Sequence, residues 1–126
     1  MPKIDERTPI WIGHMSIAAT DIEKSVGFMR KLGMRNILQK ESIAIFELRG
    51  GTHLLLKSTD EQIALGSKAP FDLMVEDIDA SHETFEALGL SPSTINQGRI
   101  HQSFTVIDPS GYEITVNSSH VSNLPV

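Results

Sequence analysis

The chain contains two copies of one unit in tandem. The segment 14–33 aligns with the segment 70–89 when the sequence is shifted by 56 residues. Identical residues then coincide at five pairs of positions: Asp21 and Asp77, Ile22 and Ile78, Ser25 and Ser81, Leu32 and Leu88, and Gly33 and Gly89. A second match, shifted by 60 residues, aligns 51–56 with 111–116. A duplicated sequence predicts a duplicated fold, in which equivalent side chains occupy equivalent places.

The first unit, residues 10–58, has the pattern of one strand, one helix and three more strands. Residues 10–19 read as a strand, and Asp21 offers a side-chain oxygen that caps a helix beginning at Ile22. Apolar residues follow at helical spacing, and Gly33 can adopt the left-handed conformation that ends a helix. Three short strands complete the predicted unit: 35–39, 42–48 and 52–58.

The second unit, residues 70–117, repeats this order. Asp77 is the predicted cap of its helix and Gly89 the predicted stop. The remaining predicted elements are a strand at 71–75, the helix at 78–88, and strands near Thr94, at 101–107 and at 112–117. A linker at 59–69 joins the units, and a tail follows at 118–126. With 126 residues and 40% hydrophobic content, we expect a single domain with a substantial core.

Composition excludes several classes of partner. The net charge is -5 and no cluster of Lys and Arg exists, so the chain lacks the basic surface that nucleic acid or an anionic membrane requires. Cysteine is absent, and no apolar run reaches the length of a signal or a membrane span. We therefore expect a soluble cytoplasmic protein whose partner is a small molecule or another protein chain.

Alternation within the strands predicts which way their side chains point. In 112–117 apolar and polar residues alternate, so the apolar set should lie under the helix and the polar set on the opposite face. The same parity brings these residues to that opposite face: His14, Ser16, His53, Leu55, Asp72, Met74, His101, Ser103, Thr105, Glu113 and Thr115. A face that is simply exposed to solvent would explain the polar residues but not the apolar ones. Because Ile43 and Ile45 also point there, a concave ligand surface explains the mixture better.

Two motifs give the chain a resemblance to a known family. They are His-x-x-Ile-x-x-x-Asp-Ile-x-x-Ser-x-x-Phe at 14–28 and Asp-Pro-x-Gly-Tyr at 108–112. Together with the tandem units they resemble the vicinal oxygen chelate superfamily, which includes glyoxalase I, extradiol dioxygenases, fosfomycin-resistance enzymes and bleomycin-resistance proteins. The resemblance implies an α+β fold in which tandem βαβββ units form curled mixed sheets around a cavity. It also implies a homodimer that completes the cavity.

The resemblance further implies one divalent metal, held by His, Glu or Gln side chains of the first and last strands of the units. The matching first-strand positions are His14 and Pro70, and the last-strand positions are Leu55 and Thr115. Only His14 is a usual metal ligand. A catalytic metal needs about three protein ligands, so the standard site is incomplete.

A displaced metal site is the alternative. His53 and Glu113 stand two residues earlier in the last strands on the same face, roughly 7 Å from the standard positions. With His14 and His101 they form a tentative ligand set that would suit Zn, Fe, Ni or Mn.

Two functions remain open on these grounds. The first is a protein that binds a small, partly apolar or aromatic molecule without a complete standard metal site. The second is a metal-dependent lyase, isomerase or dioxygenase that uses the displaced site. We favour the first, and no catalytic residue is assigned. The predicted ligand-binding residues are His14, His53, Asp72, His101, Glu113 and Thr115.

Overall fold

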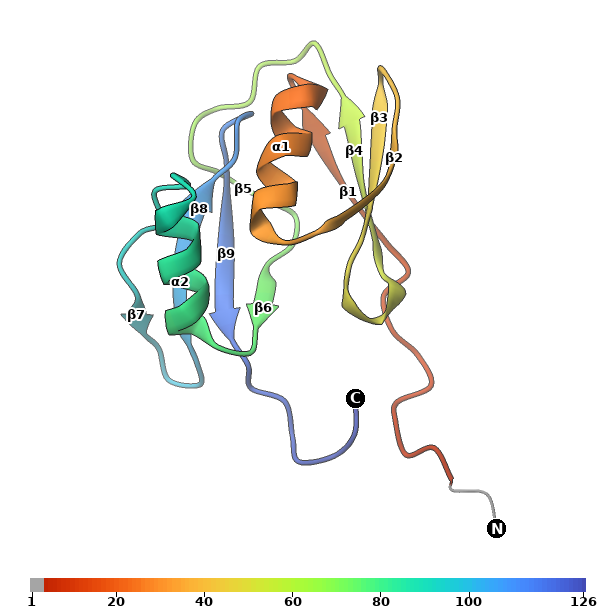
Figure 1. Cartoon of the computed structure of the whole chain (residues 1–126), viewed down its shortest axis with the longest axis vertical. Coiled ribbons are helices and arrows are strands. Elements are labelled where there is room, and N and C mark those ends of the chain that lie inside the picture. Colours follow the sequence, from red (N-terminus) through yellow and green to blue (C-terminus); the bar gives the residue numbers. More distant parts are fainter. Residues whose placement is uncertain (1–3) are drawn as a thin grey trace.

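The computed structural model describes residues 4–126. The first unit consists of β1 (His14–Ala19), α1 (Ile22–Leu32), β2 (Arg35–Gln39), β3 (Ile43–Glu47), a short 3-10 turn η1 (Arg49–Gly51) and β4 (His53–Ser58). The second consists of β6 (Leu73–Val75), α2 (Ile78–Ala87), β7 (Asn96–Gln97), β8 (Gln102–Ile107) and β9 (Tyr112–Ser118). The predicted tandem order is thus confirmed (Figure 1).

Several local features differ from the prediction. The first strand of each unit is shorter than predicted, since β1 begins at His14 rather than at residue 10 and β6 at Leu73 rather than at residue 71. The linker contains a two-residue strand, β5 (Ser67–Lys68), which pairs with β9. A pair of residues is too short to leave a periodic signal in the sequence. The connection between β3 and β4 is the 3-10 turn η1, in which Gly50 and Gly51 both have positive φ.

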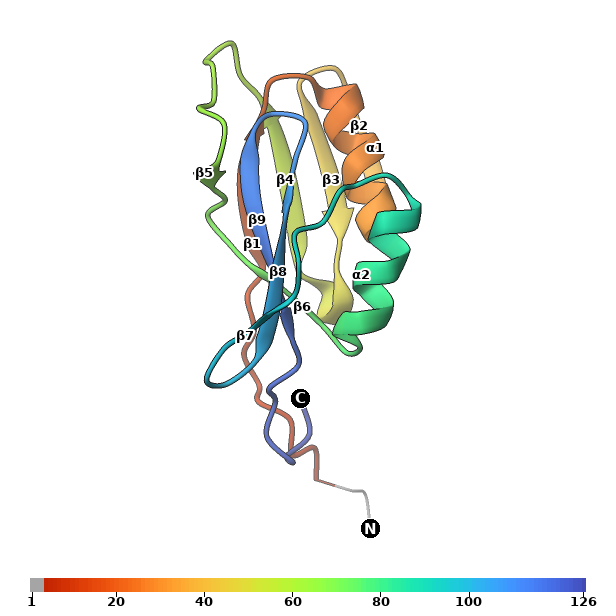
Figure 2. The same ribbon diagram turned by 90° about the vertical axis from the view of Figure 1, so that its left-hand side faces the viewer.

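Each unit folds its first strand back against its last. In the first sheet the order is β1-β4-β3-β2, with β1 parallel to β4 and β3 antiparallel to it. In the second sheet the order is β5-β9-β8-β7, and β6 pairs with β9 in parallel. Both helices lie on the same side of the strands, as Figure 2 shows. We call the opposite side of the sheets the helix-free face.

Local capping explains where the helices begin. The side chain of Asp21 accepts a hydrogen bond from the backbone N–H of Lys24 at 3.2 Å, and Asp77 accepts one from Ala80 at 3.0 Å. Each bond satisfies one of the amide groups that a helix leaves open at its start. Gly33 ends α1 in the left-handed conformation, with φ of 108°. These features were predicted and are confirmed.

One hydrophobic core extends through both units. Alternation in β9 places Ile114 and Val116 in this core, while Glu113 and Thr115 point to the helix-free face and are half-buried. The largest fully buried side chains include Phe46 and Phe104, Met29 of α1, Leu54 and Leu56.

Besides the core, polar contacts also join the units. The hydroxyl of Ser110, before β9, accepts a hydrogen bond from the backbone N–H of Thr20 at 3.0 Å. Arg49 of η1 forms an ion pair with Glu76 at 2.7 Å. The sheets themselves share no strand pairing within residues 4–126, so they do not close on each other. Neither helix is long and apolar enough to cross a bilayer.

Candidate functional site

A row of polar side chains crosses the first sheet on the helix-free face. Strand pairing places His14 of β1 beside His53 of β4, and His53 beside Glu47 of β3. Glu47 in turn pairs with Arg35 of β2. The register of four strands therefore brings together four residues that are scattered in the sequence. We call these four residues the polar row.

The members of the polar row are linked by direct contacts. Arg35 Nη1 donates to Glu47 Oε1 at 2.7 Å, and His53 Nε2 lies 3.3 Å from Glu47 Oε2. The rings of His14 and His53 meet edge to face, with 5.9 Å between their centroids. The side chains of His53 and Glu47 are 31% and 32% exposed, whereas Arg35 is 75% exposed. The centre of the row is thus partly shielded from solvent.

Apolar side chains continue the same face beyond the polar row. Leu55 of β4 lies between Ser16 of β1 and Ile45 of β3 in the strand register. Leu55, Ile45 and Ile43 are all half-buried, although no helix covers them. The first sheet therefore offers an apolar surface with a polar border at one end.

The second sheet carries different side chains at the equivalent places. Glu113 lies opposite Ile107 of β8 and beside Lys68 of β5. Thr115 lies opposite Thr105. Around the sheet, Asp72 is exposed just before β6, and His101 stacks on His120 of the tail, with ring centroids 5.0 Å apart.

The structure therefore brings two of the predicted site residues into contact, His14 and His53. The others, Asp72, His101, Glu113 and Thr115, belong to the second unit. Sequence reasoning missed Glu47 and Arg35. The parity of β3 carried a signal for Glu47, because it follows Ile43 and Ile45 at even spacing and so shares their face. Its contacts depend on strand register, which alternation alone does not give.

The implied metal does not fit the residues at the standard positions. Leu55 has apolar and hydroxyl neighbours, Thr115 faces another threonine, and Pro70 has no side-chain donor atom. Within residues 4–126 no three His, Asp or Glu side chains gather closely enough to hold a metal ion. The displaced set drawn from both units is thus not assembled within one chain.

A groove with a volume of about 950 Å³ lies between the two units. Its walls include side chains of the core and its margin, among them Met15, Leu32, Met34, Leu48, Leu73, Val75 and Phe85. Arg35, Glu47 and Asp72 also line it, and so does the ion pair of Arg49 with Glu76. The groove therefore borders both the polar row and the margin of the core.

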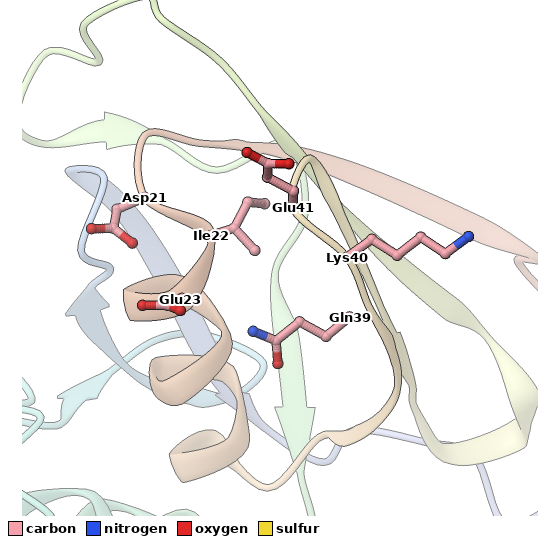
Figure 3. Close-up of a pocket in the computed structure, with 6 residues that line it drawn as sticks. All are labelled: Asp21, Ile22, Glu23, Gln39, Lys40 and Glu41. Carbon is pink, nitrogen blue, oxygen red and sulfur yellow. The ribbon is translucent and has the colours of Figure 1, made fainter.

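A second hollow, of about 650 Å³, lies at the start of α1. Its lining comes from Asp21, Ile22 and Glu23 of the helix start and from Gln39, Lys40 and Glu41 between β2 and β3 (Figure 3). Asp21 is already engaged in capping the helix. With one apolar residue and three carboxylates, this hollow does not suit an aromatic molecule.

Two polar residues of the second unit are structural. Asp108 Oδ1 accepts hydrogen bonds from the backbone N–H groups of Ser110, Gly111 and Tyr112 at 2.8–3.0 Å, which builds the turn into β9. Its other oxygen is buried without a partner. Burial raises the pKa of the Asp108 carboxyl, and the three N–H groups oppose that rise. His82 of α2 is held by the carbonyl of Ser93 at 2.8 Å.

Comparison with solved structures establishes the fold. The chain superposes on the lactoylglutathione lyase from Agrobacterium tumefaciens with a TM-score of 0.74 and 20% identity, over 93% of this chain and 99% of that one. Oxidase ChaP-H2 gives a TM-score of 0.70 at 18% identity, over 89% and 95%. A glyoxalase/bleomycin resistance protein/dioxygenase from Alicyclobacillus acidocaldarius gives 0.70 at 20%, over 91% and 96%.

Sequence comparison establishes the family. No functionally curated protein matches the sequence. The profile of one superfamily does match it, over residues 11–116, which span both units. The chain therefore belongs to the Glyoxalase/Bleomycin resistance protein/Dioxygenase superfamily.

Proposed function

We propose that the protein binds a small, partly aromatic molecule on the helix-free face of the first unit. The observation that supports this most is the surface formed by Ile43, Ile45 and Leu55, which is half-buried and bordered on one side by the polar row. Binding sites for small molecules are mostly apolar and contain a few fixed polar groups. Here the apolar residues would hold a flat ring, and the polar row would fix its orientation.

The groove between the units supports this function less well. Two of its charged residues, Arg49 and Glu76, already form an ion pair at 2.7 Å. Part of its apolar lining, including Leu32, Met34 and Leu73, packs against the core. On the helix-free face, by contrast, His14 is exposed, and no hydrogen bond within residues 4–126 uses its ring.

A second copy of the chain would complete the cavity. One chain leaves the helix-free face of both sheets open, since the sheets do not pair with each other in the described region. The segment before β1 adds exposed apolar side chains that a partner could cover, with Ile10 77%, Trp11 65% and Ile12 62% exposed. We therefore expect a homodimer. Sedimentation equilibrium at tens of micromolar protein checks this, and a monomer at that concentration would contradict it.

The binding surface can be tested with 4-ethylanisole, a neutral aromatic ether. Ile45→Ser should weaken binding by about tenfold, because burying a large aliphatic side chain is worth roughly 1.5–3 kcal/mol. Isothermal titration calorimetry measures the change.

The matched control is Val121→Ser, which alters an apolar side chain that lines the groove and is 48% exposed. It should leave the affinity unchanged. Loss of binding in Val121→Ser with unchanged binding in Ile45→Ser would move the site to the groove. Absence of binding to the wild-type protein would reject the aromatic ligand.

A further inference from the structure

The contacts of the polar row fix the tautomer of His53. A carboxylate only accepts hydrogen bonds, so the contact of His53 Nε2 with Glu47 Oε2 at 3.3 Å places the ring proton on Nε2. Arg35 holds the other carboxylate oxygen at 2.7 Å and so keeps Glu47 oriented. In the neutral ring the second nitrogen, Nδ1, is then an acceptor.

This acceptor atom is free to meet a ligand. No hydrogen bond within residues 4–126 uses His53 Nδ1. In the same region the buried side-chain atoms without a hydrogen-bond partner belong to Ser25, His101 and Asp108, so His53 Nδ1 is not one of them. An atom that is neither bonded nor buried is reached by solvent. The row thus presents one oriented acceptor to the helix-free face.

The surroundings of His53 limit what this acceptor can bind. Leu55 follows it by two residues on the same face, a separation of roughly 7 Å that suits one six-membered ring. The negative charge of Glu47 is balanced by Arg35 at 2.7 Å, so the row carries no excess charge that would select a charged ligand. An unprotonated nitrogen also offers no hydrogen to a carboxylate.

We infer that the ligand carries a hydroxyl group on an aromatic or enolic ring, and that this O–H donates to His53 Nδ1 while the ring lies over Leu55 and Ile45. The inference rests on the proposed function, because it concerns the same surface. In this arrangement His53 contacts the ligand directly. Glu47 and Arg35 are positioning residues that act through His53.

Two probes that differ in one methyl group test the inference. These are 4-ethylphenol, which can donate a hydrogen bond, and 4-ethylanisole, which cannot. The wild-type protein should bind the phenol about tenfold more tightly than the ether, since the net value of one hydrogen bond is roughly 1 kcal/mol and the ether also leaves the acceptor unpaired. In His53→Phe the ratio of the two affinities should fall to about one, while the affinity for the ether is retained.

His120→Phe is the matched control, because His120 is an exposed histidine of the C-terminal tail and is not one of the predicted ligand-binding residues. It should keep the tenfold ratio. If the wild-type protein binds both probes equally, the inference is wrong and the proposed function stands. If it binds neither probe, both are wrong. A ratio that persists in His53→Phe assigns the acceptor to another residue and overturns the inference.

The roles of Glu47 and Arg35 have a spectroscopic readout. Nitrogen-15 NMR distinguishes the two neutral tautomers of a histidine ring, and His53 should be protonated on Nε2 in the wild-type protein. Glu47→Ala should release the ring, raise the share of the tautomer protonated on Nδ1 above its wild-type level and lower the phenol-to-ether ratio. A wild-type His53 that carries its proton on Nδ1 would contradict the inference directly.

Discussion

The two units share one backbone fold but carry different side chains at equivalent positions. Glu47 and His53 are paired across β3 and β4, and the register pairs Ile107 with Glu113 across β8 and β9 in the same way. In the first unit the pair belongs to a connected row, whereas in the second Glu113 faces an aliphatic side chain. The duplicated fold therefore fixes positions, and the side chains of one copy make those positions a candidate site.

The turns that lead into the last strands, β4 and β9, also differ between the units. The first unit turns through Gly50 and Gly51, both with positive φ. The second uses the buried carboxylate of Asp108, which accepts three backbone N–H groups. At this turn a buried carboxylate stabilises the second unit, whereas the first unit relies on the backbone conformation of its glycines. Substitutions in the shared core, in the turn of the second unit and between the units test how the two units differ in what stabilises them.

The largest expected effect concerns the shared core. Phe46 of the first unit is fully buried in a cluster that also contains Phe104 of the second. Phe46→Ala should lower the free energy of unfolding by about 3–5 kcal/mol, because it leaves a cavity in the core. Denaturant unfolding should show one transition that shifts as a whole. Phe46→Leu, a milder change, should shift it less. Two separate transitions, one unchanged, would show that the units unfold independently.

The second-largest loss of stability should come from changes in the turn of the second unit. Asp108→Ala removes three hydrogen bonds to backbone N–H groups and should cost about 2 kcal/mol of stability. Asp108→Asn keeps an acceptor oxygen and should be much milder at neutral pH. Equal losses in the two variants would contradict a role for the carboxylate oxygen as the acceptor.

The contribution of Asp108 to folding stability should depend on pH with a definite sign. Burial raises the pKa of Asp108 in the folded state above its ordinary value of 3.8, so the folded state retains the proton longer than the unfolded chain. The resulting stabilisation is complete below 3.8 and is lost as the pH rises through the folded-state pKa. Asp108→Asn should therefore gain stability relative to wild type as the pH increases across this window, as measured by urea unfolding. A constant difference would contradict the raised pKa.

The smallest effect should come from the ion pair between the units. Arg49 and Glu76 are 84% and 74% exposed, and exposed pairs contribute about 0–1 kcal/mol. Arg49→Ala should change stability by less than about 1 kcal/mol, and the change should vanish at high salt. A larger loss that is insensitive to salt would mean that η1 joins the units by other contacts.

Much of the fold follows from the sequence because its signals are local. The matched caps Asp21 and Asp77, the helical stripes and the alternating strands each depend on neighbouring residues, and all appear in the structure. The two-residue strands β5 and β7 carry too little pattern to place closely. Their positions are set by pairing with β9 and β8.

The candidate site was less predictable because it depends on register. Parity alone assigned both His14 and Glu113 to the helix-free face, but it could not tell which residues touch. The parallel pairing of β1 with β4 brings His14 to His53, and Glu113 belongs to the other sheet. Glu47 and Arg35 can be recognised as site residues only from their contacts, which connect Arg35 to Glu47 and Glu47 to His53.

The central claim is that the ligand surface lies on the helix-free face of the first unit. Amide chemical-shift mapping during titration with 4-ethylphenol tests this most directly, because every strand reports separately. The account predicts that the largest shifts fall in β1, β3 and β4 around His53, Leu55 and Ile45, with little change in β8 and β9. Shifts confined to the groove, around Leu73 and Phe85, or to the strands of the second unit would contradict it.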